Sequence, residues 1–440
     1  MHTHKILELA RKEHVVFVQM QFMDILGGLK SITLPASQLE KALEEGIAFD
    51  GSSILGYATI DESDMRLCAD PNTFLILPSL NGEDKTARLL CNIYDHEDKP
   101  FSGDPRAILA KHLNVLKKQG WTLNTAPEYE FFYMRQDAEG NPTNIPADSG
   151  GYFDLMRDTS DKAREETVNY LDALGFEVEA SHHEVAPGQH EIDLKYTNAI
   201  DSADRVAMMK HVTKMIAHKH GLYATFMPKP IFGLSGSGMH THISIMDQKG
   251  KNLFYDKNKP YQLSQMALYF VGGILKYAQE ICAILSSSVN SYKRLIPGYE
   301  APVYISWANR NRSAFVRIPA GRESKTRVEI RSPDPTGNPY LQFTVMLAAG
   351  LKGIQEKINP KDPMEKDIYH MTPQERAKEN ILSLPDNLGS ALDFMAKSSL
   401  VREALGEHVF EHFLYIKHQE WDSYIKHVTD WEIKHLLPIL

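Results

Sequence analysis

Three short stretches of alternating polarity constrain the fold of this chain most, because each one gathers charged or imidazole side chains on one face of an extended strand. They are APEYEFFYM (126–134), GMHTHISI (238–245) and TRVEIRSPDP (326–335). Successive side chains of a strand point to opposite faces, so Glu128 and Glu130 share one face. His240 and His242 share a face in the same way. The pattern predicts a sheet with one strongly polar face.

The third stretch adds guanidinium groups to this polar face. Arg327, Glu329 and Arg331 align on one side of the predicted strand, opposite its two apolar residues. Carboxylates and histidine bind divalent metals, and arginines bind phosphate groups. Any one alternating stretch is typical of a half-buried strand with a solvated polar face. The three stretches together instead favour a metal-dependent phosphoryl-transfer site.

A fourth segment points to the same kind of site. SHHEVAPGQHEID (181–193) places Glu184 and Glu191 on either side of a Pro-Gly turn. The lead-in FGLSGSGMH to the histidine pair is rich in glycine, namely Gly233, Gly236 and Gly238. Glycines permit positive φ angles and let the backbone approach a ligand closely, which a solvated surface does not require.

Length and composition narrow the class of protein. At 440 residues the chain exceeds the usual size of a single hydrophobic core, so we expect two domains. A net charge of −9 gives no support for binding to nucleic acid or to a membrane surface. No apolar run approaches the roughly 20 residues that span a bilayer, and we expect no secretory signal. Three widely spaced cysteines form no disulfide framework and favour a reducing cytoplasm.

The pattern of apolar residues predicts an α+β fold. Residues 1–103 alternate helical and strand-like segments and form a small α/β unit. The stretch 94–105 is rich in proline, glycine and acids and is the predicted domain boundary. The larger domain, 104–440, is expected to hold an antiparallel sheet that presents the polar motifs. Helices alternate with its strands, including helical sequence over 263–285.

A series of motifs, taken in order, resembles the type I glutamine synthetase family of bacteria and archaea, in its shorter, non-adenylylated subtype. The motifs are FDGSSI (49–54), ESDM (62–65), PEYEFF (127–132), GGYFD (150–154), HHEVAPGQHEID (182–193), KPIFGLSGSGMHTH (229–242), NSYKRLIPGYEAP (290–302), NRSAFVRIP (311–319) and RVEIRSPDPTGNPYL (327–341). The resemblance implies a β-grasp-like domain over 1–103 that contributes Asp50 to a neighbouring subunit's site. It also implies a catalytic domain over 104–440, with a curved antiparallel sheet flanked by helices.

The resemblance implies a glutamate–ammonia ligase that joins ammonia to L-glutamate with ATP. Glutamine, ADP and phosphate would form through γ-glutamyl phosphate. Two divalent ions, Mg²⁺ or Mn²⁺, would neutralise the transferring phosphoryl group. One ion is assigned to Glu130, Glu184 and Glu191, and the other to Glu128, His240 and Glu329. Such oxygen-rich donors suit hard cations better than zinc.

Substrate and nucleotide contacts are also implied by the resemblance. Arg294 and Arg331 would hold the glutamate carboxylates, in a substrate site that includes Tyr152 and Gly236. Arg312, with Arg317, would neutralise the phosphoryl group. The nucleotide contacts are assigned to Glu179, Tyr196, His242, Ser244 and Arg327. Salt bridges and plain packing are the ordinary roles of arginine and tyrosine, but the positions inside motifs favour function.

An ammonium ion must lose a proton before it can attack an acyl phosphate. The resemblance assigns this proton to Asp50, with Tyr152 and Glu184 lining the pocket. Glu300 would be the flap residue that closes the site against water. The family assembles as a dodecamer of two stacked hexameric rings, in which Asp50 acts at the neighbouring subunit's site. Regulatory proteins of nitrogen metabolism are further partners that the resemblance allows.

Several positions bear on substrate choice and regulation. Ser235 stands where relatives carry an asparagine beside the bound amino acid, and it lacks the paired donor and acceptor of that amide. Leu55 and Thr59 replace a glutamate and an arginine linked to feedback, so we expect weak inhibition by glutamine. The region of Tyr369 is too short for the adenylylated subtype, and we expect no adenylylation. The apolar C-terminus is expected to contact other subunits.

Two alternatives to this function stay open at the level of sequence. The first is a γ-glutamyl ligase for a larger amine, such as a polyamine or ethanolamine, which only Ser235 favours. The second is a catalytically silent, nitrogen-sensing homologue. The second alternative conflicts with the retention of every predicted metal ligand.

Overall fold

The computed structural model describes residues 2–57, 63–79, 82, 84–299, 301–366 and 368–440. The helices are α1 Thr3–Lys12, α2 Leu39–Glu45, α3 Pro105–Lys118, α4 Asp161–Ala173, α5 Ala199–Lys219, α6 Gln265–Lys276, α7 Ala278–Leu285, α8 Ser291–Arg294, α9 Pro339–Glu356, α10 Pro373–Lys378, α11 Leu388–Ala396, α12 Ser399–Leu405, α13 Glu407–Ile425 and α14 Asp430–His435. The strands are β1 Val15–Met23, β2 Leu29–Pro35, β3 Ile47–Asp50, β4 Asp64–Ala69, β5 Leu75–Ile76, β6 Lys85–Tyr94, β7 Trp121–Gln136, β8 Pro142–Pro146, β9 Val178–His183, β10 Gln189–Leu194, β11 Thr197–Asn198, β12 Leu222–Thr225, β13 Thr241–Asp247, β14 Tyr304–Ile305, β15 Trp307–Ala308, β16 Val316–Arg317, β17 Val328–Ile330 and β18 Leu382–Ser383.

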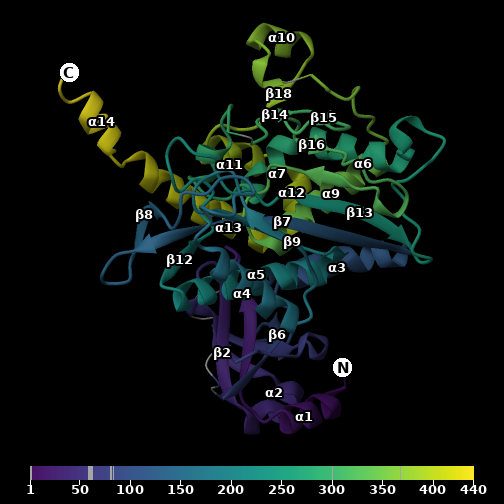
Figure 1. The fold of residues 1–440 in the computed structure, drawn as a ribbon. Helices are drawn as coiled ribbons and strands as arrows, with labels where there is room; N and C mark the ends of the chain where they lie inside the picture. The colour runs from purple at the N-terminus through teal and green to yellow at the C-terminus, as the bar shows by residue number, and fades with distance from the viewer. Residues whose placement is uncertain (1, 58–62, 80–81, 83, 300, 367) are drawn as a thin grey trace.

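The N-terminal domain is built around a mixed sheet with the strand order β2-β1-β6-β4-β3, and β5 pairs with β6 (Figure 1). β1 and β6 run parallel, whereas the other neighbours run antiparallel. The apolar sides of α1 and α2 bury Ile6 and Leu39 in the core. α2 ends at Glu45 because Gly46 adopts a φ of 75°, a conformation that glycine takes without steric cost.

The larger domain contains a sheet with the strand order β15-β16-β17-β13-β7-β10-β9. β7 is its longest strand, and β8, β11 and β12 also pair with it. The four strands that carry the predicted motifs, β17, β13, β7 and β10, are consecutive neighbours. Two of the predicted stretches are only partly extended, because β13 begins at Thr241 and β17 ends at Ile330.

Helices α4 and α5 cover the apolar face of this sheet, beneath β7 and β9 in Figure 1. Tyr129, Phe131 and Ile192 point from the strands into this core and are fully buried. Val206 and Met209 of α5 fill the same core from the helix side. Because side chains alternate along a strand, covering this face leaves the acidic residues of β7 and β10 on the opposite one.

The segment expected to be helical over 263–285 forms two helices, α6 and α7, that meet at an angle of 76°. No single helix in the described part of the chain is long and apolar enough to cross a membrane, although this bent pair passes the same test by length and composition. Helix α14 extends away from the body of the molecule in Figure 1. Its apolar end, including Leu437, Ile439 and Leu440, is exposed, and the expected subunit contact there stays a prediction.

Candidate active site

Register pairing brings the predicted motifs onto one surface of the large sheet. His242 of β13 pairs with Glu329 of β17. On the next pair of strands in the sheet, Glu130 of β7 pairs with Glu191 of β10. Since β13 and β7 are themselves neighbours, the residues that share a face in the sequence also converge in space.

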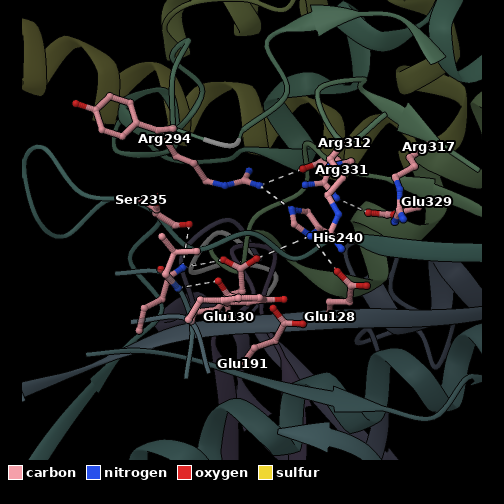
Figure 2. Close-up of a pocket in the computed structure, with 16 residues that line it drawn as sticks. Glu128, Glu130, Glu191, Ser235, His240, Arg294, Arg312, Arg317, Glu329 and Arg331 are labelled. Atoms are coloured by element: carbon pink, nitrogen blue, oxygen red, sulfur yellow. Dashed lines mark hydrogen bonds and ion pairs between the residues drawn. The ribbon is translucent and has the colours of Figure 1, made fainter. Parts of the chain in front are cut away.

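A cavity of about 270 Å³ lies over these strands (Figure 2). Its lining includes all the predicted metal ligands, Glu128, Glu130, Glu184, Glu191, His240 and Glu329. It also includes the predicted substrate and phosphoryl contacts, Tyr152, Gly236, Arg294, Arg312, Arg317 and Arg331. Figure 2 shows the carboxylates of Glu128, Glu130 and Glu191 on the strand side, with the labelled arginines on the opposite side and His240 between them. The acidic wall can bind divalent metal ions, and the basic wall that faces it can bind a phosphate group.

Glu128, His240 and Glu329 form the first candidate metal cluster, with one ligand atom of each within 4.8 Å of the others. Nδ1 of His240 lies 3.0 Å from Oε2 of Glu128. Burial, helped by the charge of Arg331, lowers the pKa of His240 to about 4. Its imidazole is therefore neutral near pH 7, which is the form that binds a metal.

Two arginines hold the carboxylate of Glu329. Nη1 of Arg317 donates to Oε2 and Nη1 of Arg331 donates to Oε1, both at 2.6 Å. Burial raises the pKa of Glu329, but the charge of Arg331 more than offsets it, and the net pKa lies below its ordinary value. Both oxygens of a charged carboxylate are thus engaged with guanidinium groups. Each oxygen keeps a second lone pair, so the carboxylate can still bind a metal ion beside the two arginines.

His182, Glu184 and Glu191 form a second candidate metal cluster within the same 4.8 Å limit. Burial, followed by the charge of Asp193, raises the pKa of Glu191 to about 12. Burial and Glu184 raise the pKa of Glu130 to about 8. Carboxylates crowded in this way need a compensating cation. The mostly oxygen donors fit a divalent ion such as Mg²⁺ or Mn²⁺.

Two residues of this site carry no prediction from sequence. His182 is the register partner of Glu191 and lies two residues before Glu184, so the alternation rule could have found it. Gln189 donates from Nε2 to Oε2 of Glu130 at 2.9 Å, and to a carbonyl of the glycine-rich segment at 3.1 Å. No local pattern marks Gln189, because its role depends on segments that are distant in the sequence.

A second cavity, of about 440 Å³, adjoins the first, and Glu128 lines both. All the predicted nucleotide contacts line it, namely Glu179, Tyr196, His242, Ser244 and Arg327. Nε of Arg327 donates to Nδ1 of His242 at 3.1 Å, and Nε2 of His242 lies 2.7 Å from Oε1 of Glu128. Half of the Tyr196 surface is exposed, so its ring is free to stack on a flat base.

Asp50 lines neither of the two cavities. It ends β3 in the N-terminal domain, is exposed, and accepts a hydrogen bond from the amide of Ser52 at 2.9 Å. Its assignment to a neighbouring subunit's site stays a prediction. Glu300 and Thr59 lie outside the described residues, so the flap role and the expected weak feedback inhibition also stay predictions.

The small mixed-sheet domain, the large sheet and the two candidate metal clusters of a cavity that adjoins a second cavity are those of a metal-dependent ligase that uses ATP. The model of the glutamine synthetase catalytic domain matches residues 102–436, and the model of the glutamine synthetase β-grasp domain matches residues 14–96. The chain therefore belongs to the glutamine synthetase family.

Individual relatives agree with this assignment. The glutamine synthetase of Methanosarcina mazei is 49% identical over 99% of this chain and 97% of its own length. That of Thermus thermophilus is 51% identical over 98% of each chain. A solved GmaS–ADP complex has a TM-score of 0.88 at 29% identity and covers 98% of this chain and 99% of that one. Plasmodium falciparum glutamine synthetase has a TM-score of 0.87 at 25% identity over 99% of both.

These likenesses confirm the predicted family and fold class, including the N-terminal β-grasp domain. They also confirm the predicted enzyme class, glutamate–ammonia ligase, over both alternatives drawn from the sequence.

Proposed function

We propose that the two adjoining cavities carry out glutamine synthesis from L-glutamate, ammonia and ATP, with ADP and phosphate as products and γ-glutamyl phosphate as the intermediate. The observation that carries the proposal is that Glu128 lines both cavities. A nucleotide held by His242 and Arg327 would direct its terminal phosphate past Glu128 into the arginine-lined cavity. Phosphoryl transfer depends on such positioning and on charge neutralisation.

One metal cluster contains Glu128, His240 and Glu329, and the other contains Glu184 and Glu191. Glu130 lies outside both clusters but lines the same cavity. We assign one ion to Glu130, Glu184 and Glu191, and the other to Glu128, His240 and Glu329. When bound, such ions neutralise the charge on a transferring phosphoryl group. Either Mg²⁺ or Mn²⁺ satisfies this donor set. The raised pKa values of Glu130 and Glu191 support the assignment, because they mark an excess of negative charge.

The arginines are assigned to the anionic groups of the substrate. Arg294 donates to the carbonyls of Ser332 at 2.9 Å and Arg331 at 3.0 Å, which fixes its guanidinium before the substrate arrives. Arg294 and Arg331 would hold the glutamate carboxylates. Arg312 and Arg317 would stabilise the phosphoryl group from the same cavity.

Tyr152 and Glu184 are assigned to the ammonium pocket, and Asp50 of a neighbouring subunit to the base that takes the proton. Three apolar residues that follow Tyr152 are strongly exposed, namely Phe153, Leu155 and Met156. Apolar side chains this exposed are typical of a surface that another protein covers. They support a homo-oligomer in which a second copy covers the mouth of the cavity. The proposed assembly is a dodecamer of two hexameric rings, located in the cytoplasm.

Phosphate release from ATP in the presence of glutamate tests the function, with ammonium compared against methylamine, ethanolamine and putrescine. We expect turnover with ammonium to exceed turnover with every larger amine. Turnover with a larger amine alone would contradict ammonia as the substrate. It would give Ser235, which lines the cavity beside Gly236, a role in amine choice. Absence of turnover with any amine, in both Mg²⁺ and Mn²⁺, would contradict the proposal as a whole.

A further inference from the structure

Four titratable side chains lie together behind the first cavity and include none of the residues assigned above. They are Asp148, Asp158, His183 and His190, all of them buried, with one ligand atom of each within 4.8 Å of the others. By composition this cluster has the donors of a metal site.

The guanidinium of Arg164 already supplies the positive charge of this cluster. Its Nη1 lies 2.7 Å from Oδ2 of Asp158 and 2.7 Å from Nδ1 of His190. Two of the four donors are therefore engaged with a fixed cation, and a metal ion would meet a like charge at close range. The cluster is a structural network rather than a third metal site.

Oδ1 of Asp148 connects three segments of the chain at the centre of this network. It accepts hydrogen bonds from the amides of Gly150 at 3.1 Å and Gly188 at 2.8 Å. It also lies 2.8 Å from Nε2 of His183. The Asp148 side chain has no exposed surface, so these charge-assisted bonds face no competition from solvent.

The segments that Asp148 connects contain or adjoin Tyr152 and Glu184, the two residues of the proposed ammonium pocket. Gly150 precedes Tyr152 by two residues, and a Cβ at Gly150 would lie only 2.6 Å from Nε2 of His183. Nδ1 of His183 lies 2.7 Å from the carbonyl oxygen of Glu184. Gly188 closes the turn that follows Glu184. The position of each pocket residue therefore depends on a bond made to Asp148 or to its histidine partner.

We propose that Asp148 is a positioning residue for the ammonium pocket, whose carboxylate holds the Tyr152 loop and the Glu184 turn in their relative places. The inference rests on the proposed function, because it takes ammonium to bind between Tyr152 and Glu184. Asp148 does not line either cavity, so it acts through the two loops. None of the predicted nucleotide contacts belongs to these loops, so an effect on ATP can arise only through the metal ion assigned to Glu184.

The test is the substitution Asp148→Asn, which keeps the shape of the side chain. It removes the charge and turns an NH₂ donor toward a histidine. We expect KM for ammonium to rise about tenfold, the low end of the effect of removing a group that supports a metal ligand. At saturating Mg²⁺, which keeps the metal ion at Glu184 bound, KM for ATP is expected to stay at its wild-type value. Gly150→Ala disturbs the same contact from the other side without removing the charge, and it decides the question if Asp148→Asn does not fold.

Asp158→Asn is the matched control, since Asp158 belongs to the same buried cluster but bonds to Arg164 and to neither loop. We expect it to keep the wild-type KM for ammonium. Tyr152→Ala distinguishes the proposed ammonium pocket from the proposed positioning role of Asp148. An unchanged KM for ammonium in Tyr152→Ala would refute the ammonium pocket itself. A raised value there, with wild-type values in Asp148→Asn and Gly150→Ala, would refute only the positioning role. Equal rises in KM for ammonium, glutamate and ATP, with a lower melting temperature, would also refute it.

Discussion

Nε2 of His242 lies 2.7 Å from Oε1 of Glu128, while Nδ1 of the same ring accepts a hydrogen bond from Nε of Arg327 at 3.1 Å. Because Nδ1 is the acceptor, the ring proton is on Nε2 and is donated to the carboxylate. One imidazole therefore connects a side chain of the nucleotide cavity to a carboxylate of the metal cluster. The orientation of Glu128 is therefore linked, through His242, to that of Arg327 in the nucleotide cavity.

Substitution of His242 by phenylalanine removes both hydrogen bonds and keeps an aromatic ring in place. The bond to Arg327 positions a predicted nucleotide contact, and a bond to a charged group contributes about 1.5 kcal/mol, so we expect its loss to raise KM for ATP about tenfold. Steady-state kinetics with saturating glutamate and ammonium measure the effect. His218→Phe, at an exposed position on α5, is the control. A change in KM for glutamate alone would contradict this link.

Glu329→Gln removes the carboxylate that pairs with Arg317 and Arg331. Loss of one partner from a buried ion pair costs about 3 kcal/mol, so the metal-free variant is expected to unfold at a lower temperature. We also expect Mn²⁺ to raise its melting temperature less than in the wild type. Calorimetry with and without Mn²⁺ measures both effects. Glu356→Gln, in an exposed pair with Lys276, is expected to change neither. An unchanged response to Mn²⁺ in Glu329→Gln would remove Glu329 from the metal site.

Strand alternation explains how much of the site is predictable from the sequence. The rule that places Glu128 beside Glu130 needs only two residues of one strand, and it also applies to His182 and Glu184. The alternation rule does not identify Gln189 or Asp148, because their hydrogen-bond partners come from segments that meet only in the folded chain.

Other features depend on information that a local pattern does not contain. The stretch 238–245 is predicted as one strand, yet β13 begins only at Thr241. The amide of Gly238 donates to the Glu130 side chain, and the amide of Met239 donates to the carbonyl of Pro333. Asp50 lies in the N-terminal domain and lines neither cavity. Its predicted role depends on a second copy of the chain, and no periodicity in one chain encodes the geometry between two.

The pH dependence of stability in the metal-free protein provides a test of the crowded carboxylates. Burial and Glu184 raise the pKa of Glu130 from 4.5 to about 8. The folded chain therefore keeps a proton that the unfolded chain loses. This stabilising contribution is complete below pH 4.5 and is lost as the pH rises to about 8. Glu130→Gln cannot lose that proton, so we expect its stability relative to the wild type to rise between pH 5 and 8.

Urea unfolding in EDTA at several pH values measures this difference, and titratable groups remote from Glu130 contribute equally to both proteins. Glu139→Gln, on an exposed turn, is the control. A stability difference that does not vary between pH 5 and 8 would contradict the raised pKa. Binding of Mn²⁺ to the wild type at pH 7 is also expected to release protons, which titration calorimetry in two buffers detects.

Mixed oligomers test whether Asp50 acts at the site of a neighbouring subunit. Asp50→Ala and Glu329→Gln are each expected to abolish activity when they are the only subunit present. A site built from the catalytic domain of an Asp50→Ala chain and the N-terminal domain of a Glu329→Gln chain has both wild-type residues. Random mixing in equal amounts gives that combination at about one quarter of the sites, because each of the two subunits at an interface is either variant with equal probability.

Co-expression of the two variants with different affinity tags, followed by two-step purification, yields the mixed assemblies for this assay. We expect them to recover about a quarter of wild-type glutamine synthesis, since the two halves of a site come from different subunits. The two variants, purified separately and combined without subunit exchange, are the control and are expected to stay inactive. If Asp50 served the cavity of its own chain, every site would contain one defect and the mixed assemblies would also be inactive. Recovery therefore distinguishes a shared site from a site completed within one subunit.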